Sequence, residues 1–150
     1  MFSHSQRAGP KMRGVTAYTL GVLVAYLLGS VIGTQMILYS VSTMALEVTL
    51  NARLGSTVDD LIGLSSSLLP MMAVSLLIPW LACDFITRRS PHLRSPLLYG
   101  LTGAFAIAIL HIALSQIFGM DVFAPARTLA GLLGQCLAGA IGGVCLNALR

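Results

Sequence analysis

Charged residues are scarce in this chain. They make up only 9% of its 150 residues, while 56% are hydrophobic. About a quarter of an ordinary soluble domain is charged. A soluble fold of this size exposes too large a fraction of its surface to hide so much apolar side chain. A bilayer can solvate that surface instead, so the composition excludes an ordinary soluble domain and predicts an integral membrane protein.

Several familiar kinds of functional site are also missing. Cys83, Cys136 and Cys145 are odd in number and lack C-x-x-C spacing, which argues against a disulfide framework and a zinc site. The basic residues behind the net charge of +4 lie at the ends of apolar runs, so nucleic-acid binding is not expected. No nucleophile–base pair, paired carboxylates or phosphate loop is visible, and we expect neither an enzyme nor a cofactor.

Soft metal donors occur near the level of one intramembrane histidine, His111. These donors are Met36, Met71, Met72 and Cys136. They show no Met-x-Met or His-x-x-x-His spacing, and methionine is an ordinary filler of apolar gaps. We therefore predict no metal site.

Long apolar runs are what the sequence has in abundance. Four of them are long enough for helices that cross the roughly 30 Å hydrocarbon core, at about residues 18–39, 61–81, 97–118 and 128–148. We predict an all-α, polytopic integral membrane protein in which residues 15–150 form a four-helix bundle. Residues 1–14 are expected to be a short basic tail.

The first connection carries helix signals. Apolar residues continue beyond the first span, so its helix is expected to run on to a C-cap near Gly55. Ser56 and Thr57 each precede an aspartate by three residues, a pattern typical of helix N-caps. We therefore expect the second helix to begin there.

Proline and tryptophan give further expectations. Pro70 and Pro79 are expected to kink the second span, because each removes a backbone donor. Trp80 is expected to mark a membrane interface, and Pro125 to open the fourth helix.

Basic residues concentrate on one side of the predicted bundle. They lie in the tail and in the connection between the second and third spans: Arg7, Lys11, Arg13, Arg88, Arg89 and Arg94. The positive-inside rule therefore predicts that both termini are cytoplasmic, and in a bacterium the membrane would be the inner one.

Small residues recur every fourth position in the last predicted helix, at Ala130, Gly134, Ala138 and Gly142. A second row lies beside it and includes Gly139 and Gly143. The first span carries a similar ridge that includes Gly29 and Gly33. Such faces let helix backbones approach closely, so both helices are expected to pack against neighbouring helices.

His111 is the only histidine, acidic or basic residue inside the predicted spans, which makes it a candidate functional residue. Gln135, Gln35 and Ser66 fall at a similar depth, and together the four predict a polar intramembrane layer. We expect His111 to be neutral and inward-facing, with Gln135 as its partner.

Two classes of function remain open. The first is a structural or accessory subunit that binds membrane lipids and packs against other transmembrane helices, in a homo-oligomer or a larger membrane complex. The second is a small oligomeric transporter or channel built around His111. Transporters usually carry intramembrane charge or matching broken helices in two halves. The sequence shows neither, so it favours the accessory role.

Overall fold

A computed structural model describes residues 10–44, 47–120 and 122–150, with side chains from Arg13 onward. The described part of the chain forms helices joined by short turns and contains no strand. The α-helices are α1 (Pro10–Ser42), α2 (Leu50–Gly63), α3 (Leu68–Arg89), α4 (Pro96–Phe118) and α5 (Leu129–Leu149). The 3-10 turns are η1 (Leu64–Ser66), η2 (Pro91–Leu93) and η3 (Ala124–Arg127).

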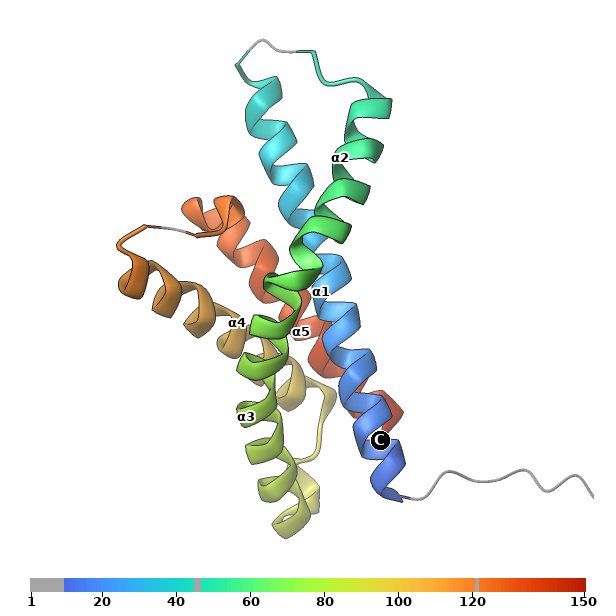
Figure 1. The fold of residues 1–150 in the computed structure, drawn as a ribbon. Helices are drawn as coiled ribbons and strands as arrows, with labels where there is room; N and C mark the ends of the chain where they lie inside the picture. Colours follow the sequence, from blue (N-terminus) through green and yellow to red (C-terminus); the bar gives the residue numbers. More distant parts are fainter. Residues whose placement is uncertain (1–9, 45–46, 121) are drawn as a thin grey trace, which may run out of the picture.

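Four of these helices, α1, α3, α4 and α5, are long and apolar enough to cross a membrane. The predicted all-α fold with four such helices is therefore confirmed. The 33 residues of α1 make a helix about 50 Å long, whereas the 21 residues of α5 give about 32 Å. The upper parts of α1 and α2 accordingly reach beyond the ends of α4 and α5 (Figure 1).

α5 is the central helix, because it packs against both α1 and α4 (Figure 1). α3 packs mainly against α4 and also touches α1. The start of α1 and the end of α5 lie together, since a Cβ on Gly14 would lie 3.7 Å from Nη2 of Arg150. The first described residues and the last residue of the chain are therefore at the same end of the bundle.

The two rows of small residues on α5 meet two different helices. Toward α1, Ala138 is fully buried, and a Cβ on Gly142 would lie 2.6 Å from the carbonyl oxygen of Gly21. Toward α4, a Cβ on Gly139 would lie 2.6 Å from the carbonyl oxygen of Gly103. Approaches this close leave no room for a side chain, so van der Waals contact between backbones joins the three helices.

The first row does not extend to Ala130, which is exposed in the first turn of α5. The turn η3 takes that place instead, since a Cβ on Gly33 would lie 2.8 Å from Cγ of Pro125. The row begins at Gly134, where a Cβ would lie 2.7 Å from Cγ2 of Ile32. Ala130 is therefore not a packing residue within this chain.

The connection after the first span differs from the prediction. α1 ends at Ser42 and a separate helix, α2, begins at Leu50. Thr49 caps α2, because its hydroxyl accepts a hydrogen bond from the backbone N–H of Ala52 at 3.3 Å. Gly55, Ser56 and Thr57 lie inside α2, so none of them ends or begins a helix.

α2 is amphipathic, but its polar side faces α1. Nη1 of Arg53 donates to Oε1 of Gln35 at 3.0 Å, and Nε2 of Gln35 donates to the Thr57 hydroxyl at 3.1 Å. The opposite side carries an apolar stripe whose members are 54–71% exposed: Leu50, Leu54, Val58 and Ile62. This arrangement is the reverse of a helix that covers a soluble core.

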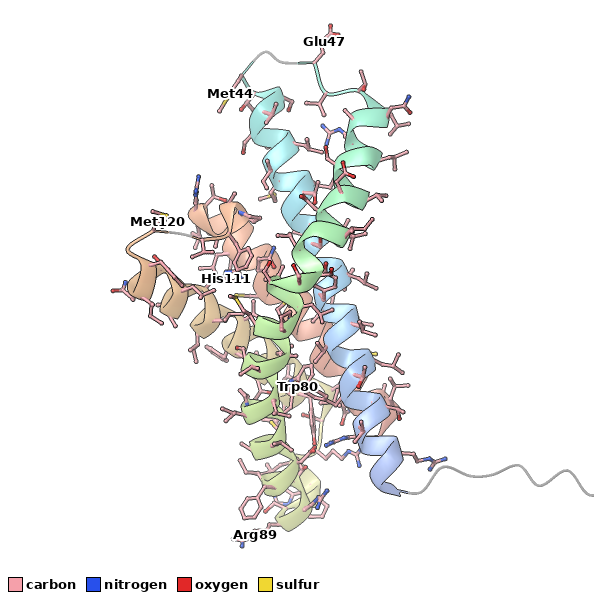
Figure 2. All side chains as sticks on the ribbon, in the orientation of Figure 1. Met44, Glu47, Trp80, Arg89, His111 and Met120 are labelled. Atoms are coloured by element: carbon pink, nitrogen blue, oxygen red, sulfur yellow. The ribbon has the colours of Figure 1, made fainter. Side chains whose placement is uncertain are left out.

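The second span begins later than predicted. The turn η1 separates α2 from α3, and Pro70 lies in the first turn of α3, where a missing N–H breaks no helical hydrogen bond. Pro79 does lie inside α3. Trp80 is only 2% exposed and packs edge-to-face on Tyr18, with ring centroids 5.9 Å apart. It therefore belongs to the core between α3 and α1, and its ring faces protein (Figure 2).

The last two spans agree closely with the prediction. Ser95 caps α4 by accepting from the N–H of Leu98, and Gly119 ends it with φ 65°, a left-handed conformation that favours glycine. Thr128 caps α5 by accepting from the N–H of Gly131 at 3.1 Å. Pro125 lies in η3, four residues before α5 begins, so it does not open that helix.

Candidate functional site: a polar pocket between the helices

A pocket of about 170 Å³ lies between the helices, toward the end of the bundle away from Arg150. The polar side chains that line it come from four helices: Ser30 and Thr34 from α1, Asp60 from α2, His111 from α4 and Gln135 from α5. We call this cavity, with the five polar side chains that line it, the polar pocket. His111 lies seven residues before Phe118, the last residue of α4, which places it about 10 Å from that end of the helix.

The remaining wall of the polar pocket is apolar. It includes Leu64 and Leu68 around the α2–α3 junction and Phe123 and Pro125 from the segment before α5. Apolar walls around a few polar groups are typical of sites that bind small molecules. Figure 2 shows His111 on α4 beside the α2–α3 junction.

Two glycines of α1 make room for the polar pocket. A Cβ on Gly29 would lie 2.8 Å from Oε1 of Gln135, and a Cβ on Gly33 would lie 3.2 Å from Nε2 of the same residue. Glycine at both positions therefore lets the Gln135 side chain lie directly against the backbone of α1. The sequence predicted helix packing at these positions, and here they accommodate a polar side chain as well.

Two buried oxygen atoms of the polar pocket have no hydrogen-bonding partner among the described residues: Oε1 of Gln135 and the hydroxyl of Ser30. Their residues are only 3% and 2% exposed. The other end of the Gln135 amide is satisfied, since Nε2 donates to the carbonyl oxygen of Gly29 at 2.9 Å. Buried polar groups normally bind a protein group, water or a ligand, so the lining of this pocket contains two hydrogen-bonding atoms that are not satisfied by the described residues.

Asp60 supplies a carboxylate to the same space. The hydroxyl of Thr34 donates to its Oδ2 at 2.7 Å, and this bond joins α1 to α2. The sequence placed Asp60 outside the predicted spans, in the connection after the first span, because Asp59 and Asp60 are spaced like acids in the first turn of a helix. Asp59 is exposed, whereas Asp60 is half-buried at the pocket. The register of α2 against α1 separates the two residues.

His111 faces inward, as the sequence predicted, and is 5% exposed. Its ring packs edge-to-face on Phe123, with the ring centroids 5.9 Å apart. The predicted bond to Gln135 is not formed through Oε1, because that atom accepts no hydrogen bond in the described structure. His111 and Gln135 nevertheless line the same pocket.

Gln35 and Ser66 do not line the polar pocket with His111. Gln35 bonds instead to Arg53 and Thr57 of α2. Ser66 is exposed, and its hydroxyl donates to the carbonyl oxygen of Gly63, three residues earlier, at 3.4 Å.

The chemistry of the polar pocket follows from its atoms. The carboxylate of Asp60 and Oε1 of Gln135 can only accept hydrogen bonds, and Ser30 can accept or donate. Acceptors therefore predominate, which suits a cation or a solute rich in hydrogen-bond donors. Within the described residues, no group of three or more histidine, cysteine or acidic side chains is placed to hold a metal ion.

A second buried polar cluster lies at the opposite end, around Asp84. The sequence suggested a polar loop there, but α3 continues to Arg89 and buries Asp84. The Tyr99 hydroxyl donates to Oδ1 of Asp84 at 2.7 Å, and Arg150 forms a salt bridge with Oδ2. Burial lowers the pKa of Arg150 below its usual value, although a guanidinium stays charged at neutral pH.

Comparison of the chain with protein-family models, with curated proteins and with solved structures finds no match. Only the geometry of the chain itself therefore bears on its function.

Proposed function

We propose that this multi-pass membrane protein binds a small cationic or donor-rich solute in the polar pocket and acts as a small transporter or channel. The observation that carries the proposal is the pair of buried oxygens, on Ser30 and Gln135, that lack partners among the described residues beside the carboxylate of Asp60. A buried acceptor without a partner costs about 1–3 kcal/mol. A solute with donors would recover that free energy.

The size of the polar pocket limits the solute. A cavity of about 150 Å³ can hold a molecule as large as benzene. The 170 Å³ observed here therefore suits a solute of a few heavy atoms, such as a small primary amine. The apolar wall, which includes Leu68 and Phe123, favours a short hydrocarbon part.

A charged group at the polar pocket also supports this proposal. Asp60 lines the polar pocket, and the turn η1 interrupts the helical path between α2 and α3 next to it. Charged groups and broken helices commonly accompany transport sites. The small-residue face of α5, which suggested binding of foreign helices, is occupied by α1 and α4.

The test uses methylammonium as the probe, because it is a small cation with three donors and one methyl group. Purified protein is heated in detergent with methylammonium chloride or with sodium acetate. Methylammonium should raise the Tm of the wild type, and acetate should not. In proteoliposomes at acidic pH, where the amine is protonated, radiolabelled methylammonium should enter faster than it enters protein-free liposomes.

The adjacent carboxylates provide matched variants. Asp60→Asn should abolish both the Tm shift and the flux, because it removes the charge at the polar pocket. Asp59→Asn removes the same charge from an exposed position and should retain both. Equal effects of the two variants, or no response of the wild type to methylammonium, would refute solute binding. Binding without flux would refute transport.

A structural or accessory role is the second candidate, and the outer face of α2 favours it. Its apolar stripe, Leu50 to Ile62, is unpaired within the described chain, although α2 is not among the four helices able to cross a membrane. A second copy of the chain could cover this stripe in a homo-oligomer. Co-purification in mild detergent should then show a particle larger than the monomer, and Leu54→Glu should reduce its size.

A further inference from the structure

Two adjoining pockets lie at the end of the bundle that contains Arg150. One, of about 490 Å³, is lined mainly by apolar side chains from α1, α3 and α5: Val15, Tyr18, Leu77, Trp80, Leu81 and Leu146. We call it the apolar groove. The other, of about 480 Å³, includes four arginines, and we call it the basic pocket: Arg13, Arg88, Arg94 and Arg150. Gly14, Asp84, Arg88 and Arg150 line both, so the two pockets adjoin.

The basic pocket carries an excess of positive charge. Among the described residues, Asp84 is the only acidic one that lines it, and this carboxylate is already bound by Arg150 and by the Tyr99 hydroxyl. The guanidinium groups of Arg13 and Arg88 come from exposed positions on α1 and α3. Two elements distant in sequence thus place positive charge around one space.

We propose that the two pockets together bind one phospholipid with an anionic headgroup. The headgroup phosphate would lie among the arginines, whose planar guanidinium groups match phosphate oxygens in pairs. An acyl chain would lie in the apolar groove between α1 and α3. Basic pockets between transmembrane helices are known to suit anionic lipid headgroups.

The apolar groove favours a lipid over a soluble anion as the ligand of the two pockets. A free phosphate or a nucleotide would use the arginines but would gain nothing from Leu77, Leu81 and Val15. An acyl chain would pack against these side chains, whose apolar surface a soluble anion would leave uncovered. A membrane-spanning chain also meets phospholipids continuously, whereas it meets soluble anions only at its ends.

The experiment compares three probes on the intact protein in a mild detergent: phosphatidylglycerol, phosphatidylcholine and inorganic phosphate. Bound lipid is counted by native mass spectrometry, and stability is measured as Tm. Phosphatidylglycerol should remain bound and raise the Tm by several degrees. Phosphatidylcholine should do so much less, because it carries no net charge, and inorganic phosphate should have no effect at the same concentration.

Variants of two neighbouring arginines distinguish a specific lipid site from general electrostatic attraction at this end of the bundle. Arg88→Gln removes a guanidinium that lines both pockets and should weaken phosphatidylglycerol binding about tenfold. Arg89→Gln removes the same charge at the same end, but Arg89 lies over the ring of Phe85, 4.5 Å from its centroid, and lines neither pocket. It should leave binding unchanged.

A second pair of variants tests the groove without changing charge. Leu77→Trp should fill the apolar groove and lower affinity for phosphatidylglycerol, whereas Phe105→Trp, at an exposed position of α4 outside both pockets, should not. Three results would overturn the proposal: equal retention of phosphatidylcholine, an equal Tm rise with inorganic phosphate alone, or equal losses in Arg88→Gln and Arg89→Gln.

Discussion

Nε2 of Gln135 on α5 lies 2.9 Å from the carbonyl oxygen of Gly29 on α1, and the glycine has no side chain that would block the approach. The bond fixes one half of the amide and leaves Oε1 without a partner among the described residues, in a side chain that lines the polar pocket. One residue therefore both joins two helices and supplies a binding atom.

Gln135→Leu tests both roles of this residue, the interhelical bond and the binding of a solute. Loss of the interhelical bond should lower the free energy of unfolding by about 0.6 kcal/mol, the average for such bonds in a membrane bundle. The Tm shift with methylammonium should disappear, because the acceptor Oε1 is lost. Gln116→Leu, at an exposed position of α4, is the control and should change neither quantity.

Gly103→Ala should be strongly destabilising. The new Cβ would meet the carbonyl oxygen of Gly139, a backbone atom that can move only if α4 and α5 separate. A loss of about 1–3 kcal/mol is expected from such overpacking. The matched control is Gly55→Ala in α2, where a Cβ would meet nothing within 4 Å. Alanine there should be neutral or stabilise by up to about 1 kcal/mol. Similar thermal denaturation of both variants in detergent would contradict this packing.

Substitutions of His111 distinguish a structural from a binding role. Glutamine can donate and accept, so His111→Gln should preserve assembly, whereas His111→Leu should weaken it modestly. If His111 contributes to the polar pocket, the glutamine variant should assemble normally and still bind methylammonium less tightly. Size-exclusion profiles and Tm shifts of both variants measure the two effects. Unchanged methylammonium binding in His111→Gln would limit this residue to packing.

The salt bridge between Asp84 and Arg150 should respond asymmetrically to mutation. Arg150→Gln leaves a buried carboxylate without its cation and should cost about 3 kcal/mol, the low end for such a loss, because the arginine side chain is still 21% exposed. Asp84→Asn should cost less, since the guanidinium can turn toward solvent and asparagine can still accept from Tyr99. The double variant should be more stable than the sum of the two losses predicts.

Reporter fusions test the orientation of the bundle. Arg150 lies beside Gly14, whereas Met44 and Glu47 lie at the far end of the α1–α2 hairpin (Figure 2). A reporter after Arg150 should therefore indicate the cytoplasm, and one inserted between Met44 and Glu47 the opposite side. Matching signals from the two positions would show that the count of crossings is not four. An external signal after Arg150 would reverse the proposed orientation.

The sequence alone determined that the chain is helical and has four segments able to cross a membrane. The reason is local: apolar length sets a crossing segment, and caps such as Ser95 and Gly119 act within a few residues of themselves. It also identified the faces of close contact on α1 and α5, because a row of small residues follows from helical spacing alone. The inward orientation of His111 could also be predicted from helical spacing.

Tertiary structure decided which helix meets which face. Gly142 meets α1 while Gly139 meets α4, and nothing in the spacing distinguishes the two partners. The register of α2 against α1 placed Asp60 at the polar pocket and left Asp59 exposed, and a shift of one residue would exchange them. Asp84 became buried because Arg150 and Tyr99, distant in sequence, supply its cation and its hydrogen bond. Such pairings depend on contacts between segments far apart in the chain, which local sequence patterns do not encode.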